Sequence, residues 1–154
     1  MTPPAEPLAE RASARDGTRL FFHASAIVVA GKGALILGPS GSGKSSLALS
    51  LIALGAELIS DDGVWVDPDR AQLQRPETPP PLIEARGVGL LRAGPICKSA
   101  PLSLVIDLSR EESQRLPPRR MAALPDQKVE LILARGHKTL APIVFHLLRF
   151  GRAD

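Results

Sequence analysis

Short apolar blocks separated by glycine and polar residues fill the first part of the chain. Blocks of this kind predict strands joined by tight turns, and they cover residues 20–22, 26–29 and 34–37. The period then changes, because the next apolar positions fall on one helical face: Leu47, Ala48, Leu51 and Ile52. Gly55 follows where a helix tends to end in a left-handed residue. The pattern therefore predicts a helix over 45–54.

The rest of the chain adds further strands and one more helix. The expected strands are 57–60, 64–66, 102–108 and 129–133, and the expected helix is 142–149. Residues 75–81 are a proline-dense connector, and the polar, basic segment 110–126 is expected to be a mobile loop. Because strands and helices alternate only partly, the predicted fold class is α/β with a mixed sheet.

Length and composition agree with one small globular domain. The chain has 154 residues, of which 44% are hydrophobic and 23% charged, enough for a core of its own. Residues 1–16 hold three prolines and alternating charges without an apolar block, so they are expected to be a mobile leader before a single domain over 17–154. The aromatic content of 3% and the net charge of +3 argue against a protein that binds nucleic acid.

Cysteine content and hydropathy indicate the cellular location that the protein suits. Cys97 is the only cysteine, which excludes an intrachain disulfide and suits a reducing, cytoplasmic location. No apolar run approaches the roughly 18 residues that cross a bilayer, so no membrane partner is expected.

One segment matches the phosphate-binding motif G-x-x-x-x-G-K-[ST]. It follows an apolar strand, opens the predicted helix, and consists of Gly38, Pro39, Ser40, Gly41, Ser42, Gly43, Lys44 and Ser45. Its amides and the helix N-terminus suit the phosphates of a nucleotide such as ATP; Lys44 reaches the β- and γ-phosphates and the Ser45 hydroxyl binds Mg²⁺. A fortuitous turn rich in glycine and serine is the alternative. The loop alone does not define the reaction, because kinases, GTPases and sensors share it.

Two adjacent carboxylates are candidates for the chemistry. Asp61 and Asp62 lie 17 and 18 residues after Lys44, the length of one helix and a return strand. This spacing places them at a strand end beside the loop, where open α/β sheets carry their sites. One carboxylate can then approach Mg²⁺ or an acceptor hydroxyl while a hydrogen bond holds the other. A polar Asp-Asp-Gly turn is the alternative.

Three further residues have both a functional and a structural interpretation. His23 ends the first apolar block and is, on local evidence alone, a strand-end residue. Glu84 precedes a flexible Gly-x-Gly and either completes a Mg²⁺ shell or pairs with Arg86. Asp107 ends a buried apolar strand, as the acid of a Walker B motif does, but it also suits a turn cap and ranks below Asp61.

The order of these features resembles the C-terminal catalytic domain of the HPr kinase/phosphorylase family. The shared features are His23, the loop 38–45 with Asp61-Asp62 after it, and the Glu-x-Arg-Gly-x-Gly segment 84–89, which is similar to the family's signature sequence. The resemblance implies a P-loop fold of the phosphoenolpyruvate carboxykinase-like type. It also implies a hexamer and a short form that lacks the family's N-terminal domain.

The resemblance also implies roles for individual residues. The activity would be ATP-dependent phosphorylation of a serine on HPr, with phosphorolysis as the reverse reaction. Asp61 would be the catalytic carboxylate with Asp62 as its supporting neighbour, and His23 the active-site histidine. Lys44 would stabilise the transferred phosphoryl group, and Ser45 and Glu84 would bind Mg²⁺.

The chain departs from the family pattern at several positions. Unusual residues for the family stand at Pro39, Ser46, Gly63 and Ala85. In the last third, 114–116 weakly resembles the segment with the catalytic arginine, and 134–138 resembles the loop for dephosphorylation.

Two other functions remain open on the sequence. One is a P-loop kinase of a small molecule, and the other is a nucleotide-sensing module without transferase activity. The basic segment has two interpretations, a contact for an acidic partner or a solvated loop, and its arginines are Arg110, Arg115, Arg119 and Arg120.

Overall fold

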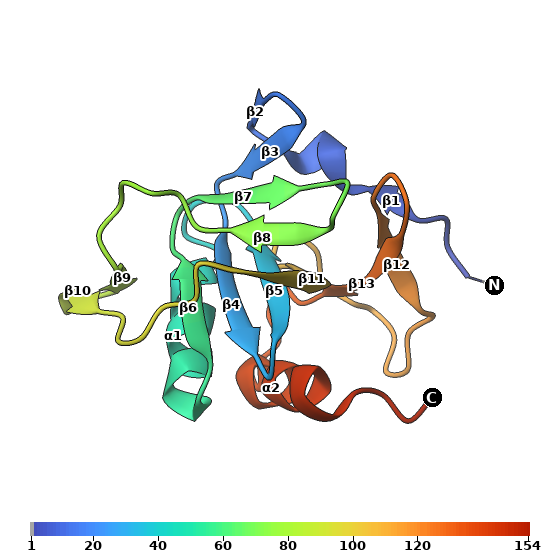
Figure 1. Ribbon diagram of the computed structural model, residues 1–154. Helices are drawn as coiled ribbons and strands as arrows, with labels where there is room; N and C mark the ends of the chain where they lie inside the picture. The colour runs from blue at the N-terminus through green and yellow to red at the C-terminus, as the bar shows by residue number, and fades with distance from the viewer. Residues whose placement is uncertain (1) are drawn as a thin grey trace.

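The computed structural model describes residues 2–154 and shows a mixed α/β fold (Figure 1). Its elements in chain order are β1 (Glu6–Pro7), a 3-10 helix η1 (Leu8–Arg11), β2 (Ala14–Asp16), β3 (Arg19–Phe22), β4 (Ser25–Val29), β5 (Lys32–Leu37), α1 (Lys44–Leu54), β6 (Glu57–Ser60), β7 (Val64–Asp67), β8 (Gln72–Gln74), β9 (Leu82–Ala85), β10 (Gly89–Arg92), β11 (Ser99–Asp107), β12 (Arg120–Ala123), β13 (Lys128–Leu133) and α2 (Leu140–Phe150). Within the described residues, no helix has the length and apolar character needed to span a membrane.

The large sheet is mixed, as the sequence predicts. Strand β5 pairs in parallel with β11 and antiparallel with β4, and β11 pairs in parallel with β13. Since β6 is antiparallel to β4, it runs in the same direction as β5. The carboxyl ends of β5, β6, β11 and β13 therefore meet at one edge of the sheet. The segments that leave this edge are the phosphate loop, the Asp61-Asp62 pair, residues 108–109 and residues 134–139.

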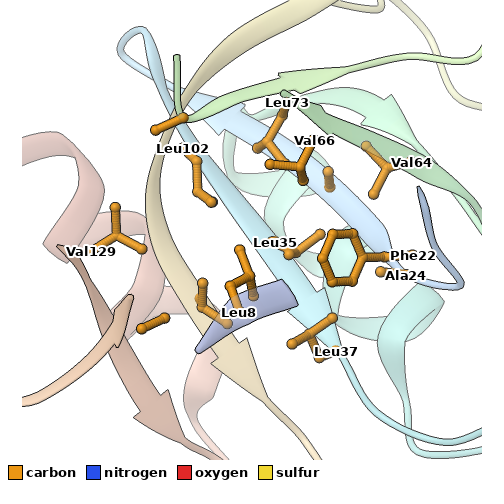
Figure 2. Close-up of a cluster of buried hydrophobic side chains, with 14 of the residues drawn as sticks. Leu8, Phe22, Ala24, Leu35, Leu37, Val64, Val66, Leu73, Leu102 and Val129 are labelled. Atoms are coloured by element: carbon orange, nitrogen blue, oxygen red, sulfur yellow. The ribbon is translucent and has the colours of Figure 1, made fainter. Parts of the chain in front are cut away.

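Two hydrophobic clusters lie on opposite faces of this sheet, because side chains alternate along each strand. On β5, Leu35 and Leu37 belong to one cluster, and Ala34 and Ile36 to the other. Figure 2 shows the first cluster, in which the β7 and β8 side chains meet those of β3 and β5. The second cluster lies beneath α1 and α2, which pack against each other. Both helices therefore cover the same face.

Helix α1 occupies the range that the sequence predicts, with one extra residue at its start. Leu47, Ala48 and Leu51 are buried. The helix ends at Gly55, whose positive φ of 121° suits glycine, and the Gly55 amide donates to the carbonyl of Ile52. Helix α2 begins two residues before the expected helix 142–149 and ends one residue after it.

Contrary to the expected mobile leader, the N-terminal segment packs on the sheet. Strand β1 pairs with β12 (Figure 1), and Leu8 is only 2% exposed. Figure 2 shows Leu8 beside Leu35 and Leu37. The expectation failed because one leucine after three prolines has no periodicity, although a single buried leucine can anchor a short segment.

The segment 110–126 is also more ordered than the expected loop. Its last part forms β12, which pairs with β13, and Arg120 makes an ion pair with Glu112 at 2.8 Å. Arg110 pairs with Glu6 and with Asp107. The ion pair with Glu6 joins residues 104 positions apart, a contact that the polar pattern of the segment could not show, and the loop prediction was wrong here.

We expect Leu8→Ala to destabilise the protein by about 2–5 kcal/mol, because it removes a buried side chain and leaves a cavity between the N-terminal segment and β5. Urea unfolding measures this change. Glu10→Ala, an exposed position on the same short helix, is the control and should change stability by less than about 0.5 kcal/mol. Equal stability of Leu8→Ala and the wild type would show that the segment is dispensable for the fold.

Candidate active site

A cavity of about 660 Å³ opens at the edge of the sheet where β5 and β6 end. It is lined by His23, Ser25, Gly38, Pro39, Ser40, Gly41, Gly43, Lys44, Ser45, Ser46, Asp61, Asp62, Leu82, Glu84, Arg86 and Leu90. Of the residues that the resemblance assigns to the phosphate loop, to catalysis or to Mg²⁺, all except Ser42 line this cavity. His23 and Glu84, which are 61 positions apart in the chain, therefore line one cavity.

The phosphate loop presents donors to this cavity. Gly43 has a left-handed conformation with φ 99°, and no side chain caps the helix that follows. The Leu47 amide donates to the Gly43 carbonyl, so the amides of the preceding turn have no partner within the helix. Such free amides, with the partial positive charge of a helix N-terminus, suit an anion.

Lys44 adds a full positive charge to the loop. Its Nζ donates to the carbonyl oxygens of Gly38 at 2.7 Å and Pro39 at 3.1 Å, so the ammonium group lies against the loop. Gly38 has no room for a side chain, because an added Cβ would collide with the Ser42 hydroxyl. The side chains of Lys44 and Ser42 therefore lie against the backbone of the loop.

Asp61 is held by groups from three elements. It accepts hydrogen bonds from the hydroxyl of Ser25 at 2.7 Å, the hydroxyl of Ser45 at 2.8 Å, and the amide of Glu84 at 3.5 Å. These donors belong to β4, α1 and β9. The carboxylate is therefore oriented directly beside the first turn of the helix that carries the phosphate loop.

The neighbouring Asp62 has a different conformation. Its φ is 61°, in the left-handed region that residues other than glycine seldom adopt. Asp61 is half-buried and Asp62 is exposed, and both line the cavity. His23 is exposed at the cavity wall, with its ring edge-on to Phe21 at 5.4 Å between ring centres.

The hairpin of β9 and β10 forms the opposite wall. Alternate residues of the first strand, Leu82 and Glu84, face the cavity, whereas Ile83 between them is buried in the core. Arg86 continues this face, and an added Cβ at Gly41 would lie 3.7 Å from its guanidinium. Over residues 2–154, the ion pairs include none between Glu84 and Arg86.

Several residues of this cavity had no assigned role in the site from the sequence. They are Ser25, Ser46, Leu82, Arg86 and Leu90. The period of two through Leu82, Glu84 and Arg86 was a usable signal for a shared strand face. Ser25 had no such signal, because its role depends on Asp61, which lies 36 residues later.

Asp107 is fully buried and serves as the centre of an ion-pair cluster. It accepts hydrogen bonds from Arg11 at 3.0 Å, from Arg110 at 2.9 Å, and from the hydroxyl of Ser109 at 2.6 Å. Burial alone raises the pKa of Asp107, but these hydrogen bonds outweigh it and hold the pKa well below its usual range. Its oxygens are thus committed to the fold, and it does not line the cavity.

The two segments in the last third of the chain that weakly resemble family segments do not line the active-site cavity. Arg115 is exposed and is not among the residues of the cavity. Residues 134–138 follow β13 and contribute to a different cavity. The other arginines of the basic segment have internal partners: Arg110 with Glu6 and Asp107, Arg119 with Asp154, and Arg120 with Glu112.

A mixed sheet with a glycine-rich loop, free helix amides and an adjacent carboxylate defines a phosphate-binding P-loop protein. The comparisons with known proteins refine this class. The family model of the HPr serine kinase C-terminal domain matches residues 17–132, and the chain belongs to this family. The resemblance noted from the motifs is thereby confirmed.

Individual relatives agree with this assignment. The chain is 31% identical over 134 residues to an HPr kinase/phosphorylase of Thermoanaerobacter sp. (strain X514), covering 81% of this chain and 43% of the relative. It is 37% identical over 139 residues to that of Bordetella avium (strain 197N), covering 79% and 45%. The chain thus spans less than half the length of these curated relatives.

A solved structure shares the fold. The Hpr(Ser) kinase/phosphatase from Coxiella burnetii superposes with a TM-score of 0.68 at 26% identity. The match covers 83% of this chain and 93% of that one. The P-loop architecture expected from the sequence is therefore confirmed.

The buried cluster around Asp107 predicts a pH dependence of stability. A lowered pKa contributes stability above the unfolded carboxyl value of about 3.9, and this contribution is lost as the pH falls below it. We expect Asp107→Asn to be less stable than the wild type at neutral pH, with the difference shrinking from about pH 5 to pH 2. Urea unfolding across this range measures the difference.

The exposed Asp126→Asn variant serves as the control for this experiment, and its stability should follow the wild type at every pH. A difference between Asp107→Asn and the wild type that stays constant on acidification would contradict the interpretation.

Proposed function

We propose that this chain is an ATP-dependent kinase that phosphorylates a serine of the phosphocarrier protein HPr. The observation that supports it most directly is the hydrogen bond from Ser45 of the phosphate loop to Asp61, which puts a proton acceptor next to the phosphate site. Family membership and relatives named HPr kinase/phosphorylase supply the acceptor protein.

The residues of the cavity suit a direct, in-line transfer. The amides of the loop and Lys44 hold the phosphates and offset the charge on the γ-phosphoryl group. Asp61 accepts the proton of the serine hydroxyl while the serine oxygen forms a bond to the γ-phosphorus. The bond from that phosphorus to the β,γ-bridging oxygen breaks, and ADP leaves with the electron pair. Phosphorolysis of the phosphoserine is proposed as the reverse activity, with phosphate as the attacking group.

The oxygen atoms near the phosphate loop fit Mg²⁺ as ligands. This ion prefers oxygen ligands and takes one or two protein groups together with phosphates and waters, so a dedicated protein cage is unnecessary. Ser45 and the carboxylate of Glu84 would hold it, and Asp61 lies at hydrogen-bond distance from that serine. When bound, the ion would neutralise charge on the β- and γ-phosphates.

The positions of Asp62 and His23 in the wall of the cavity indicate their roles. Asp62 supports Asp61 from the adjacent residue, and His23 faces the space where the acceptor serine enters. A cytoplasmic location and assembly into a hexamer complete the proposal, by analogy with the family. Light scattering of the purified protein tests the assembly.

We expect Asp61→Asn to reduce phosphoryl transfer to HPr by at least about a hundredfold, because the amide cannot accept the proton, while ATP binding changes little. Incubation with γ-labelled ATP and purified HPr measures transfer, and calorimetry measures binding. Asp69→Asn, an exposed aspartate on a turn, is the matched control.

Normal turnover of Asp61→Asn would overturn the assignment of the base. The same assay, repeated with a cell lysate, separates the rival functions. Label on a metabolite would support the small-molecule kinase, and no label on any acceptor, despite ATP binding, would support the sensing module.

The proposed metal site predicts a specific effect of Ser45→Ala. We expect the magnesium concentration for half-maximal transfer to rise roughly tenfold, the equivalent of about 1.4 kcal/mol of lost coordination. Ser45→Thr retains a hydroxyl and should restore the wild-type requirement. An unchanged magnesium requirement in Ser45→Ala would exclude this serine as a ligand.

A further inference from the structure

The hairpin of β9 and β10, which forms one wall of the active-site cavity, lies outside the large sheet. Among the described residues its two strands pair only with each other, and Figure 1 shows them apart from the other strands. A single two-stranded hairpin is at best marginally stable in water. Contacts outside its own ladder must therefore fix where it holds Glu84.

The segment that leads to this hairpin has few backbone donors. Prolines, which have no N–H group, occupy four positions of the connector 75–81: Pro76, Pro79, Pro80 and Pro81. Such a segment cannot pair with a neighbouring strand through a regular ladder of hydrogen bonds. Its attachment to the sheet must use its carbonyl oxygens or its side chains.

Strand β6, which leads to Asp61, has an unpaired carbonyl near its end. The pairing of β6 with β4 skips Ile59, because the register shifts between the two neighbours of this residue. Ile59 is fully buried, so its carbonyl oxygen needs a donor from elsewhere. An irregularity of this kind is common beside active sites, and this one lies two residues before Asp61.

The side chain of Arg75 supplies donors to both segments. Its Nη1 donates to the Ile59 carbonyl at 2.7 Å, and its Nη2 donates to the Pro79 carbonyl at 2.9 Å. Arg75 is half-buried, and burial lowers its pKa. Over residues 2–154, none of the ion pairs includes Arg75. Because a guanidinium donates along fixed directions, it holds the two carbonyls at a set separation.

The segment that returns from the hairpin is attached to β6 through its backbone. The Cys97 amide donates to the Leu58 carbonyl at 2.9 Å. At the base of the hairpin, the Ala93 amide donates to the Pro81 carbonyl at 2.9 Å. The returning segment is thus held by main-chain hydrogen bonds, whereas the outgoing segment is held to β6 by the Arg75 side chain. A substitution of Arg75 should therefore release the outgoing segment alone.

We propose that Arg75 is a positioning residue for phosphoryl transfer, an inference that deepens the proposed function and rests on it. Arg75 holds Pro79 at a fixed distance from Ile59, and thereby places Glu84 across the cavity from Asp61. The hydrogen bond from the Glu84 amide to Asp61, at 3.5 Å, is the longest that Asp61 accepts. This contact depends on the spacing that Arg75 sets.

The first test is Arg75→Met, which keeps a long side chain and removes both donors. We expect kcat for transfer to HPr to fall by about tenfold, because a small displacement of a catalytic group is costly. The KM for ATP should stay within about twofold, since Arg75 does not line the active-site cavity. Transfer from γ-labelled ATP gives both values per folded molecule.

Hydrogen exchange followed by mass spectrometry gives a readout that does not depend on activity. In Arg75→Met we expect the hairpin residues 82–92 to exchange at least about fivefold faster, while residues 44–54 of α1 exchange as in the wild type. A residue that only stabilised the fold would instead lower the urea midpoint, with faster exchange in both segments and an unchanged kcat.

Two further arginine substitutions make the result specific. Arg70→Met is the matched control, because Arg70 is an exposed arginine in the turn after β7, and it should behave as the wild type. Arg75→Lys keeps the charge without the planar fork, and its kcat should remain at least about threefold below the wild type. Arg75→Lys also decides the question if Arg75→Met fails to fold.

A double-mutant cycle tests whether Arg75 acts through Glu84. When Glu84→Gln is already present, adding Arg75→Met should lower kcat by less than about twofold, because the group that Arg75 places is then absent. Two independent effects that multiply would contradict this route.

Four results would overturn the inference. They are an unchanged kcat in Arg75→Met, hairpin exchange that changes no more than that of α1, wild-type behaviour of Arg75→Lys, and independent effects in the cycle. A wild type that transfers no phosphate to HPr would refute the proposed function. The exchange of residues 82–92 would then still support or overturn the placement of the hairpin by Arg75.

Discussion

The parallel pairing of β5 with β11 is the constraint on which the rest of this structure depends. It aligns Leu37 with Asp107, so the phosphate loop leaves the sheet directly beside the buried carboxylate. The Leu108 amide donates to the Leu37 carbonyl and extends this alignment by one residue. Because β6 and β13 run in the same direction, four chain segments emerge at one edge. The active-site cavity forms at this shared edge, because the segments that line it leave the sheet there.

The Asp107 cluster ties distant segments to this edge. Arg11 lies 96 residues away in the chain, and Arg110 connects the same carboxylate to Glu6. A buried charge without partners would be strongly unfavourable, so the buried aspartate requires its arginine partners. The N-terminal segment is thereby held against the sheet, where Leu8 closes the hydrophobic cluster shown in Figure 2. An acid that resembles a catalytic one from its sequence context therefore organises the fold.

The first turn of α1 separates two cavities of different character. On one side, Asp61, Asp62 and Glu84 surround the end of the loop with acidic groups, and Lys44 and Arg86 bring positive charge. On the other side, the walls are largely apolar. The first turn of α1 thus lies at the boundary between the two cavities.

The sequence by itself determined the parts with local signals: the phosphate loop, helix α1, the strand before Asp61, and the mixed α/β class. Periodicity and turn chemistry within about ten residues carry these features, so they can be read without the fold. Only the tertiary structure decided that Leu8 is buried, that Ser25 holds Asp61, and that a second cavity adjoins the loop. These features depend on contacts between residues tens of positions apart, and such contacts leave no pattern in the sequence near either partner.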